Sequence, residues 1–206
     1  TQLIARRIRE IGVLSEIVSC EIAPKELLNL NPKGIIFSGG PESVNSKFKP
    51  RFNSKILEIN QPILGICYGM QLLAKQCKGK VDLSAKREFG HSELVFNKNI
   101  LFKGVTEEKK KINVWMSHGD KVVRLPKQFK KIASSTNSKI AAFASNDGQR
   151  FGVQFHPEVS HTNQGQKILS NFALEICRCE KNWTSKNIID DLVQSIKDQV
   201  GNKHVL

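Results

Sequence analysis

Residues 62–74, PILGICYGMQLLA, combine two patterns that meet at a single cysteine. An apolar run with β-branched residues enters Cys67 and a segment with helical apolar spacing leaves it, which predicts a buried strand turning sharply into a helix. Gly65 and Gly69 flank the cysteine, so the backbone can tighten into an elbow that presents one side chain. Because a helix N-terminus favours a thiolate, we expect Cys67 to be a nucleophile. A small buried cysteine at a tight junction is the alternative.

A second pattern lies far downstream, in the octapeptide FGVQFHPE at residues 151–158. Its alternating apolar residues predict a strand that ends at His156. Glu158 follows two residues later, and in extended backbone that spacing directs both side chains the same way. An imidazole can then take a thiol proton while the carboxylate holds its far nitrogen. Alone, this segment also fits a solvated loop; with the cysteine elbow, it predicts a Cys67–His156–Glu158 catalytic triad.

Length and composition fit one α/β domain with a short appendage. The chain has 206 residues, 39% of them hydrophobic, which is enough to bury a sizeable core. No apolar run approaches the length of a membrane helix, and no signal-peptide pattern opens the sequence. Five scattered cysteines fit a reducing compartment better than a disulfide framework. We therefore expect a cytoplasmic protein with no membrane partner.

The formal net charge of +13 raises the question of nucleic-acid binding. The lysines are spread along the sequence, and Lys109–Lys111 is their one true run. No nucleic-acid motif or aromatic interleaving accompanies them, so we expect a solvated lysine-rich surface and no nucleic-acid partner. Cys177 and Cys179 do not have the spacing of zinc ligands, and we expect no metal.

The remaining periodicity indicates many short strands and a few helices. Strands are predicted near residues 13–18, 34–37, 81–83, 93–96, 112–116, 132–135, 140–144 and 151–155. Helices are predicted near residues 3–11, 24–30, 53–60, 68–78, 165–177 and 184–200, with a loop at 87–92 and a hairpin turn at 146–148. Consecutive strands without intervening helices indicate an antiparallel section. The expected fold class is α/β, a mostly parallel central sheet flanked by helices with an added antiparallel section.

GICYGMQ at residues 65–71 and QFHPE at 154–158 resemble the class I, triad-type glutamine amidotransferase family, and the match runs in order over essentially the whole chain. Within that class, REFGHS at 87–92, WMSHGD at 115–120 and HPEV at 156–159 resemble the glutaminase domains of GMP synthases. The resemblance implies a flavodoxin-like, three-layer amidotransferase fold.

The resemblance also implies site residues beyond the triad. Backbone N–H groups of Gly40 and Tyr68 would hold the oxyanion of a tetrahedral intermediate. Gln71 would contact L-glutamine, and the backbone at Ser117 and His118 would bind its α-groups. For Gly40, an ordinary Gly-Gly-Pro turn is the alternative.

Two regions are expected from the resemblance. Residues 1–180 would be the amidotransferase domain, lacking the strand that family members carry before the segment matching residues 1–10. Residues 181–206 would be a linker and the first helix of an ATP-pyrophosphatase (synthetase) domain. The phosphate loop of that domain is not in this sequence. We therefore expect no cofactor for the glutaminase half, and ATP with Mg²⁺ on the synthetase domain.

The expected activity is hydrolysis of L-glutamine to glutamate and ammonia. A synthetase partner would use the ammonia to aminate XMP to GMP. The resemblance also implies a homodimer as one possible assembly of the full enzyme. Amidotransferase subunits for anthranilate, aminodeoxychorismate, carbamoyl phosphate or CTP are alternatives that residues 87–92 and 115–120 disfavour. A non-catalytic remnant is a third reading, favoured by the missing strand and disfavoured by the complete triad.

Overall fold

The computed structural model describes residues 1–105 and 111–201, and a seven-stranded sheet with the order β1-β2-β7-β6-β5-β3-β4 lies at its centre. Three parallel neighbours form one end of the sheet: β1 (Ile35–Phe37), β2 (Ile63–Ile66) and β7 (Arg150–Val153). The antiparallel strands are β6 (Ala142–Ser145), β5 (Phe129–Ser135), β3 (Lys80–Phe96) and β4 (Lys111–Arg124). The predicted α/β class with parallel and antiparallel sections is confirmed, although the sheet is mixed and the antiparallel section is the larger.

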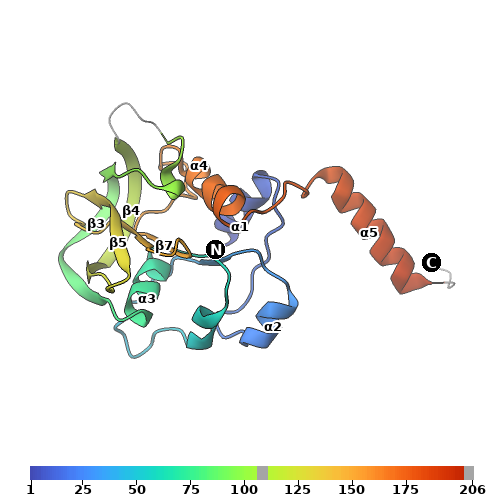
Figure 1. The fold of residues 1–206 in the computed structure, drawn as a ribbon, viewed down its shortest axis with the longest axis horizontal. Coiled ribbons are helices and arrows are strands. Elements are labelled where there is room, and N and C mark those ends of the chain that lie inside the picture. Colours follow the sequence, from blue (N-terminus) through green and yellow to red (C-terminus); the bar gives the residue numbers. More distant parts are fainter. Residues whose placement is uncertain (106–110, 202–206) are drawn as a thin grey trace.

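Helices cover both faces of the sheet, as expected for three layers (Figure 1). On one face lie α1 (Gln2–Glu10), α4 (Gly165–Ser170) and the π-helical turn η3 (Asn171–Ile176), which continues α4. On the other face lies α3 (Tyr68–Gln76). Each face has its own buried apolar cluster, so the sheet is covered on both sides.

The helix α1 shows how the apolar pattern produces this packing. Ile4 and Ile8 are one turn apart and both buried in the larger core cluster, while the arginines of the helix lie on its other faces. Gly12, with φ +93°, takes the left-handed conformation that ends the helix. The observed ends of this helix therefore lie within one residue of the predicted range 3–11.

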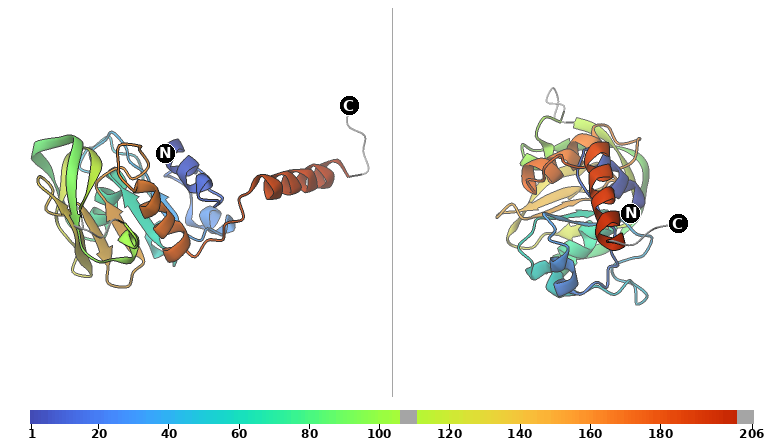
Figure 2. Two further views of the ribbon diagram at one scale, coloured as in Figure 1. Left: turned by 90° about the horizontal axis from the view of Figure 1, so that it is seen from above. Right: turned by 90° about the vertical axis from the view of Figure 1, so that its right-hand side faces the viewer.

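The remaining helices are short or stand apart. The short ones are α2 (Pro24–Asn29), η1 (Ser54–Glu58) and η2 (Ile100–Phe102). The last helix, α5 (Ser185–Val200), projects away from the sheet and its covering helices (Figure 2). The segment before it is attached to the domain where the Trp183 N–H donates to the Gly12 carbonyl at 2.9 Å. Ile189 and Leu192 of α5 are exposed.

The predicted strand at residues 13–18 is wrong. The segment is irregular, and no strand of the described sheet pairs with it. An apolar alternation becomes a strand only where a neighbour completes the backbone hydrogen bonds. Without such a neighbour, Leu14 and Ile17 are each about half exposed.

The predicted loop at residues 87–92 is also wrong, since it lies inside β3, and the strand predicted at 112–116 continues through residues 117–120 in β4. Register runs from Glu88 opposite His118 to Val95 opposite Lys111. Pairing with the neighbouring strand supplies hydrogen-bond partners for the backbone. This stabilisation outweighs the preference of a polar, glycine-containing segment for a loop.

Other local predictions hold with adjusted bounds. The hairpin turn at 146–148 joins β6 to β7, whereas the helix expected at 53–60 is only the 3₁₀ turn η1. Within the basic run Lys109–Lys111, only Lys111 belongs to the described residues, and residues 202–206 also lie outside them. In the described part of the chain, no helix combines the length and apolar character needed to span a membrane.

Candidate active site

The elbow predicted between strand and helix is confirmed at Cys67, which lies between β2 and α3. Its φ of 51° and ψ of −108° are values that residues with side chains rarely adopt. A Cβ on Gly65 would lie 2.5 Å from the Gly69 carbonyl oxygen, and one on Gly69 would lie 2.1 Å from the Phe37 oxygen. Both positions therefore require glycine, because helix and strands approach each other through their backbones.

The imidazole of His156 lies between Cys67 and Glu158. Its Nδ1 is 2.8 Å from Glu158 Oε1, and its charge interacts with the Cys67 side chain. The backbone of His156 is fixed on both sides, because its N–H donates to the Trp115 carbonyl at 3.0 Å and its carbonyl accepts from Thr162 Oγ1 at 2.6 Å. The structure thus brings the three predicted triad residues together in the predicted order.

Charge in this cluster favours a proton on His156. Burial by itself lowers the pKa of His156, but hydrogen bonds and charge interactions with Cys67 and Glu158 outweigh burial and raise it to about 10. A protonated imidazole beside a cysteine can donate its proton to the group that leaves when the cysteine reacts. The arrangement can therefore supply both a nucleophile and a proton donor.

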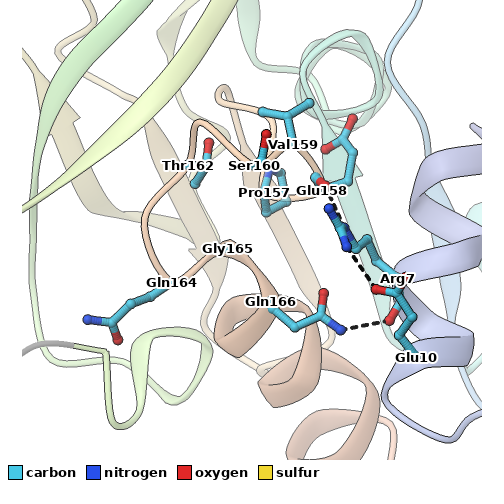
Figure 3. Close-up of a pocket in the computed structure, with 10 residues that line it drawn as sticks. All are labelled: Arg7, Glu10, Pro157, Glu158, Val159, Ser160, Thr162, Gln164, Gly165 and Gln166. Carbon is cyan, nitrogen blue, oxygen red and sulfur yellow. Dashed lines mark hydrogen bonds and ion pairs between the residues drawn. The ribbon is translucent and has the colours of Figure 1, made fainter.

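The segment that carries Glu158 is anchored to α1 through Arg7. Arg7 Nε donates to the Glu158 carbonyl at 2.9 Å, and Arg7 Nη1 lies 2.8 Å from Glu10 Oε2 (Figure 3). Gln166 Nε2 donates to the Arg7 carbonyl at 2.9 Å. Hydrogen bonds thus connect α1 with the segment 157–166, and both line a pocket of about 290 Å³. Arg7 was missed by sequence reasoning, because nothing local marks a contact across 151 positions.

The glycine loop after β1 passes beside the cysteine and the histidine. A Cβ on Gly39 would lie 3.0 Å from His156 Cε1 and 3.6 Å from Cys67 Cβ. A Cβ on Gly40 would lie 3.7 Å from the Tyr68 ring, so the two predicted oxyanion residues are neighbours. Tyr68 is the first residue of α3, and its N–H therefore has no partner within the helix. Their role in holding an oxyanion remains a prediction.

The strand β4 also contributes contacts to the site. The Ser117 carbonyl is 3.5 Å from Cys67 Sγ. Gln71 Nε2 donates to the Asp120 carbonyl at 2.8 Å and lies 3.3 Å from Gln154 Oε1. The predicted substrate-binding residues of α3 and β4 are thus linked to each other by hydrogen bonds beside the cysteine.

The His118 imidazole is buried and engaged at both nitrogens. Its Nδ1 is 2.9 Å from the Asp120 carbonyl, and its Nε2 is 3.2 Å from Glu88 Oε2. Any substrate contact at this position would therefore come from the backbone, as the resemblance implies. Glu88 was missed by sequence reasoning, since nothing in its local sequence marks it as buried. Among the described residues, no group of three or more His, Cys, Asp or Glu side chains is placed to hold a metal.

Comparisons with known proteins agree with this geometry. The chain is 48% identical over its full length to the glutamine-hydrolyzing GMP synthases of Photobacterium profundum and Coxiella burnetii, and it spans 40% of the length of each. The crystal structure of a GMP synthase subunit from Thermoplasma acidophilum superposes with a TM-score of 0.76 at 30% identity, covering 92% of this chain and 90% of that one.

A family model also matches most of the sequence. The model described as glutamine amidotransferase class-I covers residues 1–176, which include the elbow, the glycine loop and the His156–Glu158 segment. The chain therefore belongs to the class-I glutamine amidotransferase family.

Proposed function

We propose that this chain is the glutamine-hydrolysing part of a GMP synthase. The observation that carries the proposal is Cys67, held at a strained elbow beside His156, which is itself paired with Glu158. The names of its full-length relatives support the pathway, and the chain spans 40% of their length. The remainder of such an enzyme would carry the synthetase activity.

In the first half-reaction, Cys67 would attack the side-chain carbonyl carbon of L-glutamine as a thiolate. The carbonyl oxygen would take negative charge and accept from the N–H groups of Gly40 and Tyr68. His156, which holds the thiol proton, would pass it to the amide nitrogen as the C–N bond breaks. Ammonia would leave, and a γ-glutamyl thioester would remain on the sulfur.

In the second half-reaction, water would attack the thioester. His156, now neutral, would take a proton from the water, and a second tetrahedral intermediate would collapse to glutamate. The proton would return to the sulfur, which restores the thiol–imidazole pair. Glu158 would keep the imidazole in one orientation throughout and stabilise its positive charge, as the third member of a triad does.

The ammonia would pass to a synthetase domain or subunit. That partner would bind ATP and Mg²⁺ and activate XMP, and ammonia would then convert the activated nucleotide to GMP. The glutaminase half needs no cofactor in this scheme, because cysteine, histidine and backbone donors supply the chemistry. The proposed setting is the cytoplasm, where a cysteine nucleophile stays reduced.

The test is glutamate and ammonia formation from L-glutamine by the purified chain, with Cys67→Ala as the control. The assay is run with and without a separately prepared XMP-dependent synthetase, and GMP is measured in the second case. Activity that needs Cys67 and rises with the synthetase and XMP would support the proposal. A folded chain with no cysteine-dependent hydrolysis under either condition would contradict it.

A further inference from the structure

A buried carboxylate in β3 has no part in the chemistry proposed above. Glu88 is only 5% exposed. Its Oε1 accepts from Ser92 Oγ at 2.8 Å and Ser135 Oγ at 3.1 Å, and its Oε2 accepts from Ser138 Oγ at 2.9 Å. His118 Nε2, at 3.2 Å from Oε2, completes a set of four donors. Burial alone raises the pKa of Glu88, but hydrogen bonds from His118, Ser92 and Ser138 outweigh it and lower the pKa to about 2.

The carboxylate acts on its surroundings through His118. Glu88 and His118 lie directly opposite each other in the β3–β4 ladder. The other ring nitrogen of His118 is 2.9 Å from the carbonyl of Asp120, two residues further along β4. The two ring nitrogens thus face oxygen atoms on both strands, Glu88 Oε2 of β3 and the Asp120 carbonyl of β4. The ring therefore ties its own strand to a fixed anionic anchor.

The backbone held in this way meets the active site at two points. The Asp120 carbonyl that accepts from His118 also accepts from Gln71 Nε2 at 2.8 Å, and the Ser117 carbonyl is 3.5 Å from Cys67 Sγ. The β3–β4 register shifts between Leu83 and Glu88, so the ladder is irregular beside this backbone. A side-chain anchor compensates for a backbone ladder that is interrupted there.

We propose that Glu88 and His118 form a positioning pair, which holds the Ser117–Asp120 backbone against Cys67 and Gln71 in the arrangement that binds glutamine. This inference rests on the proposed glutaminase function. Both side chains are engaged with protein groups, so the pair acts on glutamine through the backbone that it holds. Loss of the pair displaces a binding surface rather than a reacting atom. The Michaelis constant for glutamine is therefore expected to rise more than the turnover number falls.

The experiment compares three variants of the 206-residue chain by glutamate formation and thermal unfolding. Glu88→Ala removes the anchor and is expected to raise KM about tenfold, with kcat within about threefold of the parent. Glu88→Gln keeps the volume, an acceptor for the serines and a hydrogen-bonding group facing His118, so its KM is expected to stay within about threefold. Asn171→Ala is the control for stability loss alone. It removes a side chain that is 1% exposed and donates to the carbonyls of Leu101 and Lys103, outside the contacts described for the site.

A second readout is alkylation of Cys67 by iodoacetamide, followed by peptide mass spectrometry. In Glu88→Ala, the glutamine concentration that halves the alkylation rate is expected to rise about tenfold, while the rate without glutamine changes less than about threefold. This separates weaker binding from a damaged nucleophile.

The outcomes distinguish failure of the proposed glutaminase function from failure of the inference about Glu88 and His118. A parent chain that neither hydrolyses glutamine nor is protected by it contradicts the proposed function, and the pairing inference fails with it. An active parent with unchanged KM in Glu88→Ala, or with the same rise in KM in Asn171→Ala, overturns the pairing inference alone. If Glu88→Ala does not fold, Ser138→Ala carries the test, because it removes one donor and is expected to raise KM about threefold. An unchanged KM in that variant overturns the inference.

Discussion

Gly69→Ala tests whether the nucleophile elbow depends on backbone contact between α3 and β1. A Cβ at this position would lie 2.1 Å from the Phe37 oxygen and 2.7 Å from Phe37 Cβ, far inside van der Waals contact. Phe37 pairs with Gly65 in the β1–β2 ladder, so β1 cannot retreat without losing that pairing. Alanine gains about 1 kcal/mol of helix propensity, whereas overpacking against backbone costs about 3 kcal/mol or more. We expect the free energy of unfolding to fall by at least about 2 kcal/mol.

Equilibrium urea unfolding followed by circular dichroism measures this change, provided that the denaturant dependence stays the same. Gly119→Ala is the matched control, because the nearest atom to its added Cβ would be 3.8 Å away and its φ is not positive. That variant is expected to lie within about 1 kcal/mol of the parent, on the stabilising side. The reasoning is refuted if Gly69→Ala is as stable as Gly119→Ala.

Three further predictions concern His156, Arg150 and Gly39. Because the pKa of His156 is raised from 6.5 to about 10, its proton stabilises the fold fully below about pH 6.5, and this contribution falls by up to about 1.4 kcal/mol per unit as pH rises toward 10. Glu158→Gln is expected to flatten that decline in urea unfolding between pH 7 and 9.5, and parallel pH profiles would contradict it. Arg150 donates to backbone carbonyls of residues 57–61, so Arg150→Ala is expected to cost about 2–4 kcal/mol in the same assay, with Arg150→Lys intermediate. In Gly39→Ala, the added Cβ would lie 3.0 Å from Cε1 of the His156 imidazole and would press on the ring. We expect kcat to fall about tenfold or more at nearly unchanged Tm. An unaltered kcat would count against so close an approach of the glycine loop to His156.

The elbow and the histidine segment were predictable because their signals are local. Glycines on both sides of Cys67 and the switch from strand to helix spacing require no knowledge of distant residues. The i, i+2 placement of His156 and Glu158 likewise follows from extended backbone. What local pattern could not supply was the meeting of the two segments, which the structure shows at Gly39, where one added Cβ would lie close to both His156 and Cys67.

The failures have the opposite character, since each depended on a partner far away in the sequence. Residues 87–92 looked like a loop because they are polar, and only their pairing with β4 makes them a strand. Residues 13–18 looked like a strand, but no strand of the described sheet pairs with them. Arg7 and Glu88 carry ordinary surface charges by sequence, and their roles arise from contacts with Glu158 and His118. Propensity is a weak guide wherever tertiary pairing decides the outcome.

The strand order explains why the site needs both sections of the sheet. Gly39, Cys67 and His156 follow the carboxyl ends of β1, β2 and β7, the edge where open α/β sheets place their ligands. In a flat sheet, β4 would lie five strand spacings from β2, about 24 Å away. Yet the Ser117 carbonyl of β4 is 3.5 Å from the sulfur of Cys67.

The sheet must therefore curl until its far edge returns over the carboxyl ends of the parallel strands. Twisted antiparallel strands make such a return possible, because their rotation accumulates along the sheet. The parallel section then supplies the nucleophile and its base, whereas the returning strand β4 supplies backbone groups on the opposite side. The Trp115 carbonyl of β4 accepts from the His156 N–H at 3.0 Å, so the same strand also fixes the base. A substitution that loosens β3–β4 pairing should therefore weaken glutamine binding, although these strands form the far edge of the sheet. Glu88 is the position at which this link between strand pairing and glutamine binding is tested most directly.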